Sequence, residues 1–396
     1  MSFSPIVSSR PFIRFGAPGI GPAEIREVAA ILRGGWIGTG PRTAAFEAGF
    51  RRYTGAPHAV AVSSGTAALH LAIVAAGIRP GDEVVTTPLT FAATANAILA
   101  AGAVPRFADV GLATQNIDPD QAARAVTRRT RAILPVHMAG RPCEMPALLA
   151  LARRRHLVVI EDASHAIEAL VGGRHAGTLG DFGCFSFTHN KNITTGEGGA
   201  VVTRRAAAAR LVRTLASQGM TSNAWQRFRR GGAAAGRIVC PGFKYSMTDL
   251  NAAIGLPQLN RIDPWWRRRL RIWDHYTARL CDLPVWLPSS EVPGGRHALH
   301  LYTVHLDPAC LRCTRDGIRD ALAARGIGTG VHYVSLHLHP YYRKRFGFAA
   351  DAFPNARCIS ERTLSLPFSP HLTDVEVDRV AEGFRAVIER AARPSR

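Results

Sequence analysis

Short apolar runs alternate with segments of helical periodicity over much of the first 160 residues. Runs of four or five apolar residues, many of them β-branched, are typical of buried strands, whereas apolar residues three and four apart are typical of helices. Strands are predicted at 58–62, 83–86, 104–107, 132–136 and 157–160. Helices are predicted between and after them at 67–74, 91–101, 118–128 and 144–155. This alternation predicts an α/β fold with a largely parallel sheet that is covered by helices on both faces.

The pattern changes on either side of this region. Helices are predicted at 21–33, 42–53, 204–216, 249–259 and 264–280, with a long loop at 218–240. Beyond residue 300 we expect a strand at 301–306, a helix at 315–325, a strand at 328–334 and a helix at 374–392. A chain of 396 residues is long for one core. We therefore expect a large α/β domain at 1–250 and a smaller α+β domain at 251–396.

The composition is that of a globular protein. Apolar residues make up 47% and charged residues 20% of the sequence. No uninterrupted apolar run reaches the length of about 18 residues that predicts a transmembrane helix. The start of the chain lacks the apolar core and cleavage site of a secretory signal. Seven cysteines, odd in number and scattered, favour a reducing cytoplasm.

Cysteine and histidine spacing does not predict a metal site. Cys310 and Cys313 form a lone CxxC without a second pair, so two ordinary side chains are the better interpretation. His332, His337 and His339 lie close together in the sequence, but their spacings and the lack of a nearby carboxylate fit no common site. Hydrogen bonding to a substrate is the better interpretation of these three histidines.

The formal net charge of +20 raises the question of a nucleic-acid or membrane partner. The arginines are spread along the whole chain, and the densest groups, at 153–155, 227–230 and 267–269, do not form a stacking platform with aromatic residues. The favoured interpretation is an arginine-rich composition that suits an anionic, phosphate-bearing substrate. We expect neither nucleic acid nor a membrane as a partner.

One lysine stands out in the stretch 184–202, CFSFTHNKNITTGEGGAVV. The stretch predicts a short strand, a polar turn that carries Lys191, a glycine-rich reversal and a second strand. Only three of the 49 basic residues are lysine, namely Lys191, Lys244 and Lys344. Arginine cannot supply a deprotonated amine, so a lysine kept in this turn suggests a nucleophile that forms Schiff bases with carbonyls or pyridoxal phosphate. A plain surface lysine in a hairpin is the alternative.

Other predicted strand ends carry polar or aromatic groups. The turn Ser-Ser-Gly65-Thr66 runs from a strand into a helix, where free N–H groups and the helix dipole favour an anion. Asp162 follows the strand at 157–160, His165 lies three residues on, and Phe91 begins a helix at the same edge. The ordinary alternatives are a helix cap for the turn and for Asp162, a satisfied polar contact for His165 and core packing for Phe91.

These features converge on one chemistry. Pyridoxal phosphate needs a lysine, a carboxylate that keeps its pyridine nitrogen protonated, and a site for its phosphate. Lys191, Asp162 and the turn at 65–66 supply these groups, and all three fall at strand ends of one predicted sheet, where ligands bind in such folds. The convergence therefore favours a cofactor site over three unrelated structural features.

Nine stretches, in order, make the chain resemble a known family. They are GGWIGTGP, VSSGTAALHLA, GDEVVTTPLTFAATANAI, NIDPD, ILPVHMAGRPCEM, VIEDASHAIEA, GTLGDFGCFSFTHNKNITTGEGGAVVT, PGFKYSMTDLNAAIGLPQL and VHYVSLHLHPYY. Over nearly its whole length the chain resembles the pyridoxal-phosphate-dependent nucleotide-sugar aminotransferases of the DegT/StrS type. The resemblance implies an aspartate-aminotransferase-like fold of type I, with a smaller C-terminal α+β domain.

The resemblance also implies roles for the cofactor-binding residues. Lys191 would hold the cofactor as a Schiff base and act as acid and base. Asp162 would pair with the pyridine nitrogen, Phe91 would stack on the ring, and His165 would lie beside the ring hydroxyl. The implied phosphate-binding residues are Gly65, Thr66 and Ser186.

The remaining implied residues lie on the substrate side or at a subunit boundary. The implied substrate-binding residues are Thr39, Lys244, His332 and Tyr333. The family fold implies a homodimer whose active sites are shared, with the loop PGFKYSMTD reaching into the neighbouring site. Many relatives carry asparagine where this chain has Ser246, a residue that helps bind the partner's cofactor phosphate. The shorter serine leaves this contact open, and Lys244 is a candidate to supply charge there instead.

The implied reaction moves an amino group from a donor, L-glutamate by resemblance, to a keto group on a nucleotide-linked hexose. Relatives that have become sugar dehydratases replace the lysine with histidine, so Lys191 argues against that alternative. A non-catalytic or regulatory protein on the same fold is the other alternative, against which the intact Lys191 and Asp162 argue. The sugar, the nucleotide and the position of amination stay open, and so does an aminocyclitol precursor as substrate.

Overall fold

A computed structural model describes residues 11–222, 224–229 and 236–393. Its largest sheet has seven strands in the order β1-β9-β8-β5-β4-β2-β3. They are β1 (His58–Val62), β2 (Glu83–Thr86), β3 (Val104–Phe107), β4 (Thr130–Ile133), β5 (Val158–Asp162), β8 (Phe182–Ser186) and β9 (Gly199–Thr203). Only β9 runs against its two neighbours, and every other adjacent pair is parallel. The predicted mostly parallel sheet is therefore confirmed.

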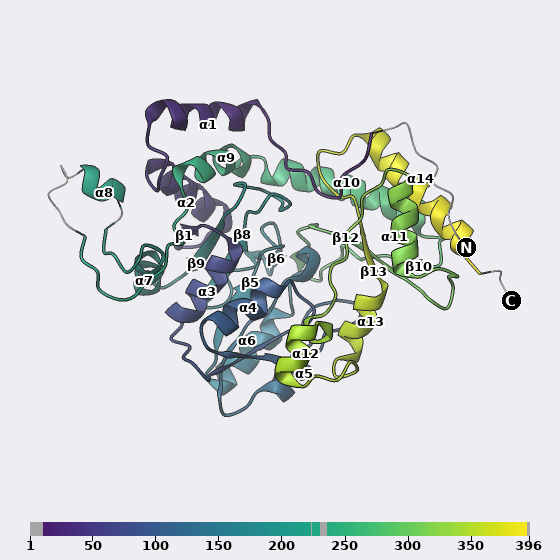
Figure 1. Cartoon of the computed structure of the whole chain (residues 1–396), viewed down its shortest axis with the longest axis horizontal. Helices are drawn as coiled ribbons and strands as arrows, with labels where there is room; N and C mark the ends of the chain where they lie inside the picture. Colours follow the sequence, from purple (N-terminus) through teal and green to yellow (C-terminus); the bar gives the residue numbers. More distant parts are fainter. Residues whose placement is uncertain (1–10, 223, 230–235, 394–396) are drawn as a thin grey trace.

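Alternation along the strands divides the core between the two faces of this sheet. In β1, Val60 and Val62 pack with one cluster, whereas Ala59 and Ala61 pack with another that contains Phe46, because successive side chains of a strand point to opposite faces. The helices around this sheet are α1 (Pro22–Gly34), α2 (Pro41–Thr54), α3 (Gly65–Ala75), α4 (Ala92–Ala100), α5 (Pro119–Ala125), α6 (Met145–Arg155), α7 (Ala206–Ala216) and α9 (Asp249–Leu259). In Figure 1, α1 lies at the top of the view, and the sheet and the other helices of this list lie below it.

The C-terminal part has its own small sheet and core. The strands β10 (Val285–Trp286), β12 (Tyr302–Leu306) and β13 (Thr363–Leu366) form an antiparallel sheet. Its helices are α10 (Ile262–Leu280), α11 (Arg315–Ala324) and α14 (Asp374–Ala391). Trp273, Tyr276, Tyr302 and Phe384 pack together in this core, which also takes in Ile13 from the N-terminal segment. The helix α10 runs between the two parts of the molecule (Figure 1). The division of the chain at residue 250 stays a prediction.

Short elements complete the fold. They are β6 (Leu170–Val171), β7 (Arg174–His175), β11 (Gly295–Arg296), α8 (Ala224–Arg229), α12 (Pro340–Phe346), α13 (Pro354–Arg362) and the 3₁₀ turns η1 (Met138–Gly140) and η2 (Leu336–Leu338). Within the residues described, no helix combines the length and the apolar character needed to cross a membrane.

The structure differs from the sequence prediction in several places. The strand predicted at 328–334 is wrong, because this segment forms only an isolated bridge between Gly330 and Ser365. In this segment His332 packs against Phe15 and Tyr333 packs against Phe91, without a strand ladder. The strand predicted at 132–136 lies at 130–133 as β4, and the predicted loop at 218–240 contains the short helix α8.

Candidate active site

A cavity of about 410 Å³ opens at the carboxyl ends of the parallel strands β5 and β8. Ligands of open α/β sheets bind at this edge because the strand-to-helix turns converge there. Its lining residues come from five places in the sequence. These are the start of α3, the start of α4, the end of β5 with the turn after it, the connection from β8 to β9, and the segment after residue 331. Lys191, Asp162, Gly65, Thr66, Phe91, Ser186, His332 and Tyr333 all line it.

Lys191 lies in the connection between the antiparallel strands β8 and β9 and is half-buried. Its backbone N–H donates to the Thr188 carbonyl at 3.0 Å, which forms the turn expected from the sequence. Burial lowers the pKa of Lys191 to about 8, and the nearby Asp162 carboxylate opposes this shift. Because Lys191 is half-buried and lines the cavity, it is not a plain surface lysine, and its lowered pKa favours the deprotonated amine.

Asp162 is the last residue of β5 and is buried. Its Oδ2 accepts a hydrogen bond from the Thr94 hydroxyl at 2.8 Å, and its Oδ1 accepts one from the Ser164 backbone N–H at 3.1 Å. The chain continues into a turn and then β6, so Asp162 does not cap a helix. A carboxylate that is fixed in this way at a cavity wall suits a cationic ring nitrogen.

The start of α3 lines the cavity and has the free N–H groups on which the predicted anion site depends. The Ser64 side chain caps the helix by accepting a hydrogen bond from the Ala67 N–H at 3.0 Å. The N–H groups of Gly65 and Thr66 lie in the first turn of the helix, so no carbonyl of the helix accepts from them. A Cβ placed on Gly65 would lie 2.7 Å from the Cβ of Ser186. Glycine at 65 is therefore required for close packing of α3 on the end of β8, which brings the Ser186 hydroxyl to this turn.

Aromatic and imidazole groups form the opposite side of the cavity. Phe91 is 61% exposed, so it is not a core residue, and its ring centroid lies 6.0 Å from that of Tyr333. The Tyr333 hydroxyl and the His165 Nε2 are hydrogen-bonded at 3.2 Å. His332 Nδ1 is hydrogen-bonded to the Ser365 hydroxyl at 2.8 Å. Burial, reinforced by the charge of Lys191, lowers the pKa of His165 and lowers that of His332 to about 4.

Other predicted residues lie outside this cavity within one chain. Thr39 donates its hydroxyl to the Met247 carbonyl at 2.6 Å, and Ser246 donates to the Ala216 carbonyl at 3.0 Å. Lys244 is exposed. His337 and His339 do not line this cavity and are each hydrogen-bonded to a backbone carbonyl, so a substrate contact for these two histidines stays a prediction.

The site also contains residues that were not predicted. Thr94 holds Asp162, and the Thr90 and Thr94 hydroxyls are hydrogen-bonded to each other at 2.8 Å. Their spacing of four residues around Phe91 indicates one helical face, which is a weak signal that could have drawn attention to them. Thr188 and Glu197 line the cavity mouth, where the Thr188 hydroxyl donates to Glu197 at 2.8 Å.

The arrangement fits pyridoxal phosphate. Asp162 and Lys191 share one cavity with the start of α3, where the space beside Ser186 is kept free of a side chain at Gly65. The buried His165 Nδ1 lacks a hydrogen-bond partner among the described residues, so it is free to meet a polar group of a ligand. Among the residues that the structure describes, no group of three or more Cys, His, Asp or Glu side chains is placed to hold a metal ion.

Comparison with known proteins decides the family. The family model described as DegT/DnrJ/EryC1/StrS aminotransferase family matches residues 18–385. The chain belongs to this family. The spore coat polysaccharide biosynthesis protein SpsC from Bacillus subtilis is 44% identical over 381 residues, which cover 96% of this chain and 98% of SpsC. The predicted family and transaminase class are thus confirmed.

Solved structures agree with this assignment. The putative sugar aminotransferase Spr1654 from Streptococcus pneumoniae, solved in PLP and PMP forms, has a TM-score of 0.89 at 32% identity, with 96% of this chain and 99% of that chain covered. The Helicobacter pylori aminotransferase PseC, involved in pseudoaminic acid biosynthesis, has a TM-score of 0.88 at 26% identity and covers 96% and 100%. The fold of type I and the pyridoxal phosphate cofactor predicted from the sequence are confirmed.

Proposed function

We propose that this aminotransferase transfers an amino group from an amino acid, L-glutamate, to a keto group of a nucleotide-linked sugar in amino-sugar biosynthesis. The observation that carries the proposal is the shared cavity of Lys191, Asp162 and the start of α3. The sugar chemistry of SpsC, Spr1654 and PseC supports the substrate class. The excess of cations in the sequence also suits a substrate with a diphosphate.

The proposed cofactor site uses the residues predicted from the sequence. Lys191 would hold the cofactor covalently, Asp162 would pair with its pyridine nitrogen, and Phe91 would stack on the ring. The Nδ1 of His165 would bind the ring hydroxyl, which would give this buried atom the partner that it lacks within the described chain. The proposed phosphate-binding groups are the N–H groups of Gly65 and Thr66, the Thr66 hydroxyl and the Ser186 hydroxyl.

The protein groups divide the work of proton transfer and orientation. Bound pyridoxal phosphate supplies a carbonyl that accepts the amino group and a ring that draws electrons from the reacting carbon. The pKa of the Lys191 amine is lowered to about 8. This value is close to neutral pH, where a group with such a pKa can serve as both acid and base. Asp162 is fixed by Thr94 and Ser164 and would keep a proton on the ring nitrogen of the bound cofactor. His332, neutral near pH 7 because burial lowers its pKa to about 4, is suited to hydrogen-bond a substrate without adding charge.

The substrate side of the site is proposed from His332, Tyr333, Thr39 and Lys244. The first two line the cavity of one chain. Thr39 and Lys244 lie outside it, so a role for them requires a second copy of the chain. Lys244 is exposed on the segment 241–249, which supports the proposal that it binds a phosphate group of a substrate held by the partner. The intact Lys191 continues to argue against the dehydratase alternative.

A homodimer with shared active sites is part of this proposal. An aromatic group near the predicted partner loop supports it: the ring centroids of Trp36 and Trp225 lie 4.9 Å apart, and those of Trp36 and Phe228 lie 5.6 Å apart. Phe228 is 65% exposed and the neighbouring Ile37 is 54% exposed. Exposed apolar side chains that gather at one place mark an interaction surface, and a second copy of the chain is the proposed occupant.

A cytoplasmic location is proposed on the state of the cysteines. All seven are free thiols, and Cys143 and Cys184 are buried. Free thiols persist in reducing compartments.

One spectrum tests the cofactor assignment. Purified enzyme with pyridoxal phosphate should absorb in the visible, and borohydride reduction followed by peptide mapping should place the cofactor on Lys191. Lys191→Ala should abolish turnover, whereas the matched variant Lys344→Ala should retain it because Lys344 lies on α12, outside the cavity. Labelling at Lys244 or Lys344 instead of Lys191 would overturn the assignment.

Two further measurements test the substrate and the dimer. A panel of keto nucleotide sugars and aminocyclitol precursors with L-glutamate should yield an aminated sugar, and turnover of only the aminocyclitol precursors would contradict the sugar proposal. Light scattering should give a dimer. Mixing inactive Lys191→Ala with a Lys244→Ala variant should restore activity in hybrid dimers, and the absence of restoration would contradict shared sites.

A further inference from the structure

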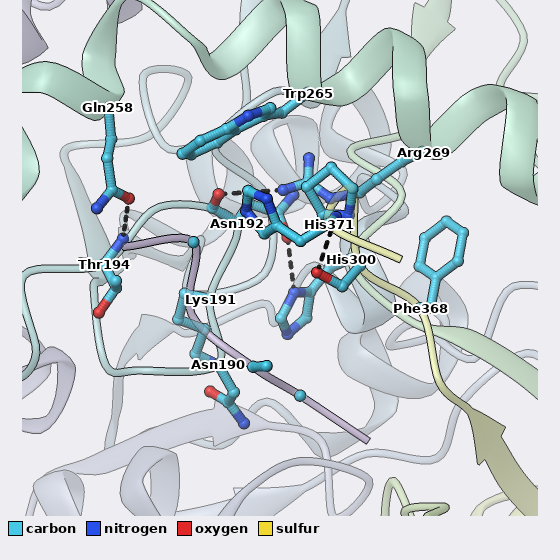
Figure 2. A pocket seen from close by; sticks show the side chains of 15 residues that line it. Asn190, Lys191, Asn192, Thr194, Gln258, Trp265, Arg269, His300, Phe368 and His371 are labelled. Carbon is cyan, nitrogen blue, oxygen red and sulfur yellow. Dashed lines mark hydrogen bonds between the residues drawn. The ribbon is translucent and has the colours of Figure 1, made fainter. Parts of the chain in front are cut away.

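A chain of buried polar groups lies behind Lys191, on the side away from the main cavity. It begins at Asn192, the residue that follows the lysine, and includes Glu168, Arg269 from α10, and His300. Each of these side chains is buried, with exposed fractions of 9% or less. Lys191, Asn192, Arg269 and His300 also line a second cavity of about 30 Å³, which Figure 2 shows at close range.

Asn192 uses every polar group of its side chain. Its Nδ2 donates to Glu168 Oε2 at 2.6 Å and to the Ala298 carbonyl at 3.1 Å, and its Oδ1 is hydrogen-bonded to His300 Nδ1 at 2.9 Å. Its backbone carbonyl accepts from Arg269 Nη2 at 3.0 Å. The residue next to the lysine is thus held from α10, from the turn after β5 and from the segment before β12.

These contacts also fix the tautomer of His300. The Nδ2 of Asn192 is identified as the donor because both of its partners, a carboxylate and a carbonyl, can only accept. Its Oδ1 must then accept from His300, so the proton of the imidazole lies on Nδ1 and Nε2 is left as an acceptor. Burial, together with the nearby His165, Lys191, His332 and Arg269, lowers the pKa of His300 and keeps the ring neutral.

His300 in turn contacts the cofactor side of the site. Its ring packs on that of His165 with the centroids 4.4 Å apart and an interplanar angle of 35°. His165 is hydrogen-bonded to Tyr333. A path of direct contacts therefore runs from the backbone next to Lys191 through Asn192, His300 and His165 to Tyr333 at the cavity wall.

The ion pair at the base of this path is unusually well enclosed. Arg269 Nη1 donates to Glu168 Oε1 at 2.9 Å, and the two side chains are 3% and 0% exposed. A buried ion pair often gives no net stability over apolar side chains of the same volume, because removing two charges from water is expensive. Its place beside Lys191 points to a positioning role, because Glu168 binds the side-chain Nδ2 of Asn192 and Arg269 binds the Asn192 backbone carbonyl.

We propose that Asn192 is a positioning residue that fixes Lys191 and, through the Nδ1–H tautomer of His300, fixes His165. The proposal rests on the proposed function, because it takes Lys191 and His165 to act on the cofactor. It assigns to Asn192, His300, Arg269 and Glu168 an effect on the cofactor that neither their sequence positions nor the family assignment supplies.

The experiment compares Asn192→Ala with Asn116→Ala in the enzyme loaded with pyridoxal phosphate. Asn116 is a matched control because it is also buried, does not line the cavity and bonds through both side-chain atoms, to the carbonyls of Arg141 and Pro142 and to the Met138 N–H. Asn192→Ala should lower kcat by roughly 10²-fold, the effect of a displacement of about 1 Å in a catalytic group. It should also shift the midpoint of the pH titration of the visible absorbance, whereas Asn116→Ala should lower only the thermal stability.

Equal behaviour of the two variants, with lower stability but wild-type kcat and titration midpoint, would overturn the proposal. A wild-type enzyme that binds no pyridoxal phosphate would instead contradict the proposed function, so the two failures are distinguishable. If Asn192→Ala does not fold, His300→Asn and His300→Leu replace it. Asparagine keeps a donor near the position of Nδ1 and should preserve the titration midpoint, whereas leucine should shift it; the same midpoint in both would overturn the proposal.

Discussion

Gly65→Ala is the substitution whose effect follows most directly from the geometry of the site. The added methyl carbon would lie 2.7 Å from the Cβ and 3.3 Å from the Cα of Ser186. Carbon atoms at their best separation lie about 3.5–4.0 Å apart, so the overlap is roughly 1 Å. Rotation of the Ser186 side chain cannot relieve it, because the Cα and Cβ positions follow the backbone of β8. The start of α3 must therefore move away from the strand.

This displacement should have two measurable effects. Overpacking of this kind destabilises by about 1–3 kcal/mol, so the cofactor-free variant should melt a few degrees lower. The N–H groups at the start of α3 should also lose their alignment with the Ser186 hydroxyl. Each loss of about 1.4 kcal/mol in phosphate contacts weakens binding tenfold, and we expect the Kd for pyridoxal phosphate to rise at least tenfold in a fluorescence titration.

Matched variants separate crowding from a general effect of the substitution. Gly34→Ala adds a methyl group at the end of α1, where no atom lies within 4 Å, and should leave both measurements unchanged or slightly increase stability. Combining Gly65→Ala with Ser186→Gly removes the atom responsible for the closest overlap, so the stability losses should be less than additive. Unchanged stability and cofactor affinity in Gly65→Ala would refute the steric reasoning.

Three further substitutions test other parts of the site. In the cofactor-free enzyme, Lys191→Met should raise stability near neutral pH. Burial lowers the pKa of the lysine to about 8 from its ordinary 10.5, so below pH 10.5 the unfolded chain binds the proton more tightly than the folded chain, which opposes folding. In thermal melts the gain should be full below pH 8 and should fade as the pH rises to about 10.5. Tyr333→Phe leaves the buried His165 Nε2 without its partner and should lower the free energy of unfolding in urea by about 1–3 kcal/mol. Arg269→Met leaves the buried Glu168 without its cation and should lower the same quantity by about 3–5 kcal/mol.

Each of these predictions has a contradicting result. A gain in Lys191→Met that does not change with pH would exclude the shifted pKa as its cause. Tyr333→Phe with wild-type stability would mean that His165 has another partner. For Arg269→Met the control is Arg319→Met, which breaks a half-exposed pair with Asp316 and should change stability far less because water solvates both charges; equal losses would contradict the enclosed ion pair.

Local pattern was sufficient for most elements of the large sheet. The predicted strands at 58–62, 83–86 and 104–107 coincide with β1, β2 and β3, and the predicted helix at 249–259 coincides with α9. These segments combine apolar periodicity with clear turn residues at their ends. The segment 328–334 misled because His332 and Tyr333 pack against Phe15 and Phe91, and the residue types alone do not reveal whether the backbone has a strand partner.

The sequence by itself determined the chemistry of this protein. A rare lysine in a glycine-rich turn, an aspartate after a buried strand and a Ser-Gly-Thr turn before a helix predict the cofactor, because each residue type has a property that few others supply. Their convergence in one cavity was also predictable, since parallel strands place their carboxyl ends at one edge.

Only the tertiary structure decided how these groups are held. Thr94 meets Asp162 across 68 residues of sequence, and Arg269 meets Glu168 across 101. Hydrogen bonds over such separations depend on the packing of α4 against β5 and of α10 against the lysine loop, which local periodicity does not encode. The same holds for the lowered pKa of Lys191 and for the neutral His165, because burial is a property of the folded chain.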